Sequence, residues 1–332
     1  MLKITAGFKW LLLLALLAVL PGCPLQDDEP LRIGINAWPG YELLYLAQEK
    51  GFYRDEGLEV KLIEFGALSD ARLAMERGQI DGAGTTLVEV LVAREHSQYS
   101  PQVVQVIDAS AGADVILASP AIKDVAALRG ANIGVELGSL GVYLLARGLE
   151  QHGLKLADVK LVDMDQASMR EAMTKGRLAA AVSYPPMSLN IMRDGTAKVI
   201  FSSAQIPGEI IDVIAVEAQV IQRRPADVAK LIRAYHQALR YTQQNPAEAY
   251  RIMAAREGIT PEEFRVAFTD GIHVLSAAEQ AAYFKPAGKL AMVMDTTDRI
   301  LRQNGQIKGA DRRADAVNGA FADTGVNTGL AR

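Results

Sequence analysis

The hydrophobic pattern of this chain repeats about one hundred residues further along. Three segments return in the same order and register: 32–35 as 132–135, 60–63 as 159–162, and 74–80 as 172–178. A repeat of this length is a small domain rather than a solenoid unit, whose period is roughly 20–50 residues. Two similar lobes in one chain predict a cleft between them, and clefts at domain interfaces are common binding sites for small ligands.

Short apolar runs alternate with helical patterns inside each copy. The predicted strands are 31–36, 58–65, 80–82 and 103–107 in the first copy, and 115–118, 132–135, 159–162 and 179–183 in the second. Strands that alternate with helices predict βαβ units and a largely parallel sheet. We therefore expect an α/β protein with two lobes, each a mainly parallel sheet flanked by helices.

Polar residues mark the predicted helix starts. Ser69 is a plausible N-cap, because its hydroxyl can accept a hydrogen bond from a backbone N–H of the first turn. Thr86 followed three residues later by Glu89 is the pattern of a capping box, in which each side chain bonds the backbone N–H of the other residue. Ser168 marks a helix start in the second copy.

The pattern also divides the chain into parts. We predict that lobe 1 comprises 31–112 and 212–303, the second part holding the return segment and the C-terminal helices, and that lobe 2 comprises 113–211. The chain would cross between the lobes near 111–113 and again after Pro207. From 304 to 332 the sequence turns polar and rich in Gly and Ala, which predicts a loosely ordered tail.

The N-terminal segment has a different pattern. Lysines precede an apolar run from Trp10 to Leu20, and Cys23 follows shortly after it. Such a run is typical of a secretory signal peptide and is too short to span a bilayer comfortably. Because Cys23 resembles the acylated cysteine of a bacterial lipoprotein, we expect a signal peptide over 1–22, a lipid on Cys23 and a tether over 23–30. The protein would then be anchored at the periplasmic or extracytoplasmic face of a bacterial membrane. An ordinary secretory signal with an incidental cysteine is the alternative.

Composition narrows the function classes. One cysteine permits no intramolecular disulfide and no thiolate cluster, and the four histidines are widely scattered, so we predict no metal and no cofactor. The formal net charge is −4 and no basic cluster occurs, which argues against nucleic acid as a partner. The motif GxxxxGK followed by Ser or Thr is absent, which argues against nucleotide hydrolysis. We expect a monomer that binds a small molecule.

The candidate binding residues lie in loops that follow the predicted strands or at the two crossings. In open α/β sheets, ligands bind beyond the carboxyl ends of the strands. The candidates are Trp38, Tyr41, Ser69, Thr85, Thr86, Asp108, Ser139, Tyr184 and Asp212. Because they include no Lys or Arg, we predict a small organic ligand that stacks on Trp38 and Tyr184, with its acidic group near Ser139. The two aspartates are compatible with an amine.

Structural roles could also explain these residues. Trp38 beside Pro39 could fasten a loop to its lobe, and Tyr184 with the two following prolines could be a rigid brace between lobes. Gly82 and Gly84 could serve a tight turn, since glycine-rich turns are weak signals for phosphate. An Asp at a strand end is often a cap.

Several motifs in combination resemble a known family. Residues 33–41 read IGINAWPGY, 78–83 GQIDGA, 112–116 GADVI and 128–135 LRGANIGV. Over about 31–270 this set is similar to the nitrate/sulfonate/taurine-type solute-binding proteins of ABC importers. The resemblance implies a two-lobed periplasmic-binding-protein fold of type II that closes around a ligand and presents it to a permease. Pro185-Pro186 departs from the Glu-Pro dipeptide often found there, so the resemblance does not identify the ligand.

Three functions remain open from the sequence. The first is a lipid-anchored solute-binding protein for uptake, with permease subunits as partners and a ligand that is sulfonate/taurine-like or pyrimidine-like. The second is a ligand sensor with the same fold. The third is an enzyme similar to thiamine-pyrimidine synthases, which share the resemblance. Those enzymes carry iron-ligating histidines and a cysteine cluster that have no counterpart in this sequence. We therefore predict a binding protein and not an enzyme.

Overall fold

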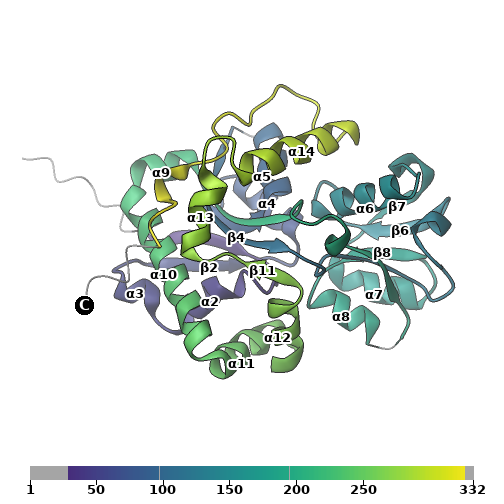
Figure 1. Cartoon of the computed structure of the whole chain (residues 1–332), viewed down its shortest axis with the longest axis horizontal. Coiled ribbons are helices and arrows are strands. Elements are labelled where there is room, and N and C mark those ends of the chain that lie inside the picture. The colour runs from purple at the N-terminus through teal and green to yellow at the C-terminus, as the bar shows by residue number, and fades with distance from the viewer. Residues whose placement is uncertain (1–28, 97, 194, 326–332) are drawn as a thin grey trace, which may run out of the picture.

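The strands form two sheets in the computed structural model, which describes residues 29–96, 98–193 and 195–325. One sheet contains β1 (Leu31–Ile35), β2 (Val60–Glu64), β3 (Gly82–Thr86), β4 (Pro101–Ser110), β10 (Ile211–Glu217) and β11 (Ile272–Val274). The other contains β5 (Val115–Ala118), β6 (Asn132–Val135), β7 (Lys160–Asp163), β8 (Ala180–Ser183) and β9 (Lys198–Ser202). Figure 1 shows the two sheets side by side, each with helices packed on it. We call the part around the first sheet lobe 1 and the part around the second sheet lobe 2.

The two sheets repeat one arrangement. Their strand orders are β11-β4-β10-β3-β1-β2 and β7-β6-β8-β5-β9. The first strand of each copy, β1 or β6, pairs in parallel with its two neighbours. An antiparallel strand, β10 or β5, then lies beside the third strand of the copy and makes each sheet mixed. The predicted α/β class with two helix-flanked sheets is confirmed. The prediction that each sheet is mainly parallel is wrong, because the ladders β3–β10, β4–β10, β4–β11, β5–β8 and β5–β9 are antiparallel.

The helices divide between the lobes. Those of lobe 1 are α2 (Glu42–Glu49), α3 (Phe52–Asp55), α4 (Leu68–Glu76), α5 (Leu87–His96), α9 (Ala218–Arg223), α10 (Pro225–Gln244), α11 (Pro246–Glu257), α12 (Pro261–Thr269), α13 (Ala277–Phe284) and α14 (Lys289–Gln303). Those of lobe 2 are α6 (Leu140–Gln151), α7 (Gln166–Thr174) and α8 (Met187–Met192). Helices on both faces leave the central strands β3 and β10 completely buried. Among the described residues, no helix is both long enough and apolar enough to span a bilayer.

Two crossing segments connect the lobes and lie against each other. The first, 111–114, joins β4 to β5, and the second, 203–210, joins β9 to β10. The hydroxyl oxygens of Ser110 and Ser203 are 2.7 Å apart, and the backbone N–H of Gly112 donates to the Ser203 hydroxyl at 2.7 Å. Adjacent connections of this kind can act as one hinge for lobe opening and closure.

The segment 305–325 is not loosely ordered, contrary to the prediction for 304–332, and the part of the predicted tail after 325 lies outside the described residues. The segment packs on lobe 1 as far as residue 325. The Val103 N–H donates to the Ala316 carbonyl at 2.8 Å, and the Asn318 N–H donates to the Val103 carbonyl at 2.9 Å. Ala316 and Phe321 are buried. The polar composition hid a few apolar residues that are sufficient to hold the segment on the sheet.

Three local predictions also differ from the structure. The strand predicted at 80–82 lies at Gly82–Thr86, so Thr85 and Thr86 end a strand. Its glycines give space rather than a turn: a Cβ on Gly82 would lie 2.6 Å from the Ala215 carbonyl oxygen, and one on Gly84 would lie 3.2 Å from the Tyr41 ring. The cap predicted at Ser168 is Asp165, whose carboxylate accepts from the Ser168 N–H at 2.8 Å. The residue before α4 is Ala67, so Ser69 lies inside that helix rather than at its cap.

Candidate functional site

A small cavity lies between the lobes. It is lined by Asn36, Trp38, Tyr41, Leu68, Thr86 and Asp212 of lobe 1, by Asp114 of the first crossing, and by Leu140 and Tyr184 of lobe 2. Its volume of about 10 Å³ is roughly that needed for a single water molecule. The lobes are therefore closed on each other, and a larger ligand could enter only if they separated. A hollow of about 480 Å³ beside β2 is larger, but lobe 1 alone lines it.

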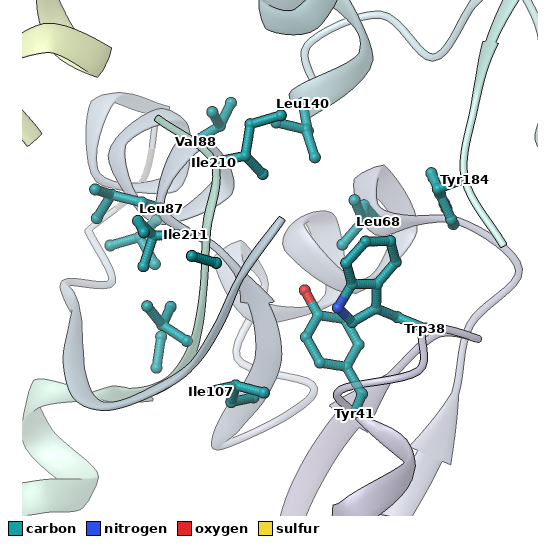
Figure 2. Packing of buried hydrophobic residues seen from close by; sticks show 14 of the residues in the cluster. Trp38, Tyr41, Leu68, Leu87, Val88, Ile107, Leu140, Tyr184, Ile210 and Ile211 are labelled. Atoms are coloured by element: carbon teal, nitrogen blue, oxygen red, sulfur yellow. The ribbon is translucent and has the colours of Figure 1, made fainter. Parts of the chain in front are cut away.

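Three aromatic rings form one wall of the cavity. The Trp38 ring centroid lies 6.3 Å from that of Tyr41 and 6.0 Å from that of Tyr184, which meets the indole nearly edge-on at 77°. Figure 2 shows Trp38 beside Tyr41, with Leu68 and Tyr184 near the indole. Gly40 permits this turn to lie on β4, because a Cβ there would be 1.9 Å from an Asp108 carboxylate oxygen. Tyr184 thus brings lobe 2 against the aromatic residues of lobe 1.

Two aspartates form a buried pair behind the aromatic wall. Asp108 and Asp212 are direct partners across the β4–β10 ladder. Trp38 Nε1 donates to Asp108 Oδ2 at 3.1 Å, and the Tyr41 hydroxyl donates to Asp212 Oδ1. Burial raises the pKa of Asp108 to about 7, while burial and the neighbouring Asp108 charge raise the pKa of Asp212 well above its usual range. The pair can therefore retain a shared proton near neutral pH.

Two further acidic groups have raised pKa values, one that lines the cavity and one that lies near the lining residue Tyr184. Burial raises the pKa of Asp114 to about 7 and that of Glu136, at the end of β6, to about 8. Within the described chain, Asn36 Oδ1 and Asp114 Oδ2 receive no hydrogen bond. Unpartnered buried acceptors are costly, so a ligand that supplied N–H donors would stabilise the site.

Glu89 joins the two lobes with its carboxylate. It is completely buried in the first turn of α5, where Thr86 donates to its Oε2. Its Oε1 accepts from the Ser139 hydroxyl and from the Leu140 backbone N–H of lobe 2, both at 2.8 Å. The structure shows an N-cap bond in place of the predicted capping box: Thr86 accepts from the Val88 N–H at 3.1 Å, and the Glu89 side chain reaches across the cleft.

The structure brings most of the predicted site residues together. Trp38, Tyr41, Thr86, Tyr184 and Asp212 line the cavity, and Asp108 holds Trp38 from behind. Ser139 lies next to the lining residue Leu140, and its hydroxyl contacts Glu89 where we expected an acidic group of the ligand. Thr85 is buried and Ser69 half-buried, and neither lines the cavity.

Sequence reasoning missed several residues of the site, namely Asn36, Leu68, Glu89, Asp114, Glu136 and Leu140. Asn36 and Asp114 occur in the motifs that carried the family resemblance, which was a usable signal. Local pattern contained no sign that Glu89 contacts the other lobe. No group of three or more His, Cys, Asp or Glu residues in the described ranges has an arrangement suited to a metal ion.

The chain belongs to the NMT1/THI5-like family, whose model matches residues 38–249. The resemblance to solute-binding proteins of the nitrate/sulfonate/taurine type is thereby confirmed. One relative is a protein of Brucella abortus (strain 2308) named as a binding protein, 25% identical over 86% of this chain and 94% of its own length. Another is the 4-amino-5-hydroxymethyl-2-methylpyrimidine phosphate synthase of Aspergillus parasiticus, 22% identical over 65% of this chain and 66% of its own length.

Solved structures share the two-lobed fold. The alkanesulfonate-binding protein SsuA of Xanthomonas axonopodis pv. citri, bound to MOPS, aligns with a TM-score of 0.73 at 20% identity and covers 89% of this chain and 100% of its own. The desulfurization enzyme DszB aligns with a TM-score of 0.63 at 16% identity, over 89% of this chain and 99% of its own. The periplasmic-binding-protein fold is therefore shared by binding proteins and by at least one enzyme.

Proposed function

We propose that this protein is the extracytoplasmic solute-binding component of an ABC importer. It would capture a small organic ligand by closure of its lobes and deliver the ligand to a permease. One observation carries the proposal: a cavity lined by both lobes combines three aromatic rings with buried carboxyl groups. Aromatic surfaces with a few polar groups of fixed position are typical of sites for small organic molecules.

The chemistry of the cavity favours a ligand with an amine. In the described structure, none of the lining residues is Lys or Arg, whereas Asp114 and Asp212 both face the cavity. An ammonium or an amino-pyrimidine could donate to these carboxylates and stack on the Trp38 ring. The cavity therefore favours the pyrimidine-like ligand of our sequence-based prediction over the sulfonate-like one.

A panel of compounds tests this function. Purified protein would be titrated by calorimetry with aliphatic amines, amino-pyrimidines, taurine, alkylsulfonates, sulfate and nitrate. We expect binding of an amine or amino-pyrimidine, accompanied by a change in the emission of Trp38, because its ring lies at the cavity. Micromolar binding of nitrate or sulfate, with none by the organic amines, would show that the proposed ligand class is wrong.

Ligand sensing and catalysis are the two alternative functions, and the lining of the cavity argues only against catalysis. A sensor of the same fold would bind the same ligand, and only the identity of its membrane partner would distinguish it. Catalysis is considered because one relative is a synthase. In the described structure, the cavity is lined by neither His nor Cys, and His236 is buried in α10 beside Tyr235. This lining favours binding over an iron-dependent synthesis.

Membrane attachment is a separate prediction, because Cys23 and the rest of 1–28 lie outside the described residues. If Cys23 is lipidated, two or three acyl chains should hold the protein on a membrane, since a single chain binds only marginally. Cells that produce the wild type or Cys23→Ser would be fractionated. The wild type should be found with the membrane, and Cys23→Ser should be found in the soluble fraction. Identical distributions of the two forms would rule out the anchor.

A further inference from the structure

Glu89 occupies a position with the chemistry of an anion-binding site. Leu140 is the first residue of α6, a helix of 12 residues. Its N–H is one of the donors at the helix start that have no acceptor within the helix itself. Ser139 is the N-cap of that helix, but its hydroxyl makes no capping bond and donates to Glu89 instead. Backbone N–H groups and hydroxyls at a helix N-terminus favour negative charge. The carboxylate that fills this position comes from the protein itself.

A second helix supports the same carboxylate. Glu89 lies in the first turn of its own helix, α5, and therefore near the positive end of that helix as well. It is completely buried, and its two oxygens accept from Thr86, Ser139 and Leu140. Two helix N-termini, one from each lobe, thus converge on one internal acid.

An arginine lies close to the same helix start. Arg72 of α4 is buried, and a Cβ on Gly138 would lie 3.5 Å from its Nη2. Its Nε has no hydrogen-bond partner within the described structure, although its Nη1 pairs with Glu76. The guanidinium of Arg72 therefore lies beside Gly138, the residue before Ser139. This surrounding would suit an anion if the Glu89 carboxylate were absent.

We propose that Glu89 determines the specificity of the cleft by occupying, from lobe 1, the place on α6 where an anionic group of a ligand would bind. An incoming sulfonate or carboxylate would compete for the Leu140 N–H and the Ser139 hydroxyl, and would be repelled by the Glu89 charge. A cationic ligand meets no such competition. The same carboxylate holds the lobes together, because its charge-assisted hydrogen bonds to α6 can form only when the cleft is closed.

Methanesulfonate is the probe for this role, because it presents a compact oxyanion with little else. Calorimetry would compare the wild type with Glu89→Ala, Glu89→Gln and a control, Arg193→Ala. The control removes an exposed ion pair across the lobes, Arg193–Glu263 at 3.0 Å, without touching α6. We expect at least about tenfold tighter methanesulfonate binding by Glu89→Ala, a smaller gain by Glu89→Gln, and none by the control.

Solution scattering gives a second readout that needs no ligand. The radius of gyration should increase in both Glu89 variants, because the lobes lose a buried contact that closes them. It should stay unchanged in Arg193→Ala, because the ion pair that this variant removes is exposed and contributes little in water. If Glu89→Ala does not fold, the isosteric Glu89→Gln decides the question by both measurements. Affinities within twofold of the wild type, together with unchanged scattering, would overturn the proposal.

The inference rests on the proposed solute-binding function, but the two can fail separately. Absence of amine binding together with a gain of methanesulfonate binding would reject the ligand class and retain the role of Glu89. Amine binding without any gain of methanesulfonate binding in the variants would retain the function and reject the role of Glu89.

Discussion

Replacement of Asp212 by asparagine is expected to weaken binding of an amine ligand by about tenfold to a hundredfold. A hydrogen bond to a charged group contributes about 1.5–3 kcal/mol, and a tenfold change in affinity corresponds to about 1.4 kcal/mol. Asp212 faces the cavity beside Tyr41, which donates to it. The introduced amide keeps the shape of the side chain and can still accept from Tyr41, but it carries no charge for the ligand.

The same substitution should stabilise the ligand-free protein. Burial and the adjacent Asp108 raise the pKa of Asp212 well above its usual range, which means that the folded state disfavours its ionisation. An amide in its place avoids that cost and can donate to Asp108. Weaker binding combined with a higher Tm is the behaviour of a residue retained for function at the expense of stability.

Asp81→Asn is a matched control for Asp212→Asn. Asp81 is another buried aspartate of lobe 1, but it accepts from the Arg32 backbone N–H at 2.8 Å and from the Arg32 guanidinium at 2.6 Å. Its replacement should lower the Tm and leave ligand affinity unchanged, the opposite of the Asp212 result. Calorimetry and thermal unfolding of both variants would check this contrast. Unchanged affinity in Asp212→Asn would remove the aspartate pair from the binding site.

The sequence was sufficient to predict several of the residues that line the cavity between the lobes. Alternation of strands and helices places the loops after the strands at one edge of each sheet, and this rule brought Trp38, Tyr41 and Tyr184 together. It worked because these side chains lie in the loops that follow β1 and β8. The antiparallel course of β10 beside β4 lay outside the local pattern, so the direct pairing of Asp108 with Asp212 could not be predicted.

Glu89 shows why the rest of the site could not be predicted. Its spacing from Thr86 matches a capping box, and local pattern alone assigned its side chain to its own helix. The partners that it has in the structure, Ser139 and Leu140, are 50 and 51 residues away in the other lobe. These contacts form only when the lobes close, so the hydrophobic periodicity of the sequence cannot predict them. The packed segment before residue 325 was missed for a similar reason, since Val103 is its partner from the first copy.

Raising the pH from 6.5 to 8 is expected to destabilise the ligand-free protein and to strengthen its binding of an aliphatic amine. Burial raises the pKa of Asp108 and Asp114 from 3.8 to about 7. The folded state then binds more protons than the unfolded chain between these pH values, so stability falls as pH rises through the interval. Ionisation of each group should lower the free energy of unfolding of the protein by about 1 kcal/mol between pH 6.5 and 8.

The pH interval is chosen to minimise the contribution of an opposing histidine. Burial and the Arg240 charge lower the pKa of His236 from 6.5 to about 4. The folded state therefore binds fewer protons than the unfolded chain between pH 4 and 6.5, where this group makes stability rise with pH. Between pH 6.5 and 8 the unfolded histidine loses its remaining protons, so this group opposes the aspartates by only about 0.4 kcal/mol. Three buried glutamates with raised pKa values contribute with the same sign as the aspartates: Glu136, whose pKa is about 8, Glu42, whose pKa is about 7, and Glu257. Replacement of each by Gln separates its share.

Binding of an amine should lower the raised pKa values of the buried aspartates. The ammonium of an aliphatic amine stays protonated up to about pH 10, so its charge is constant over the interval, and it favours the ionised forms of Asp114 and of the Asp108–Asp212 pair. Binding should therefore release protons. Calorimetry at pH 7 in two buffers of different ionisation enthalpy would measure the release, which should decrease in Asp114→Asn and Asp212→Asn but persist in Glu257→Gln. Amine binding with no proton release and no dependence on pH would mean that these carboxyl groups do not face the ligand, because a cation beside them must lower their pKa values.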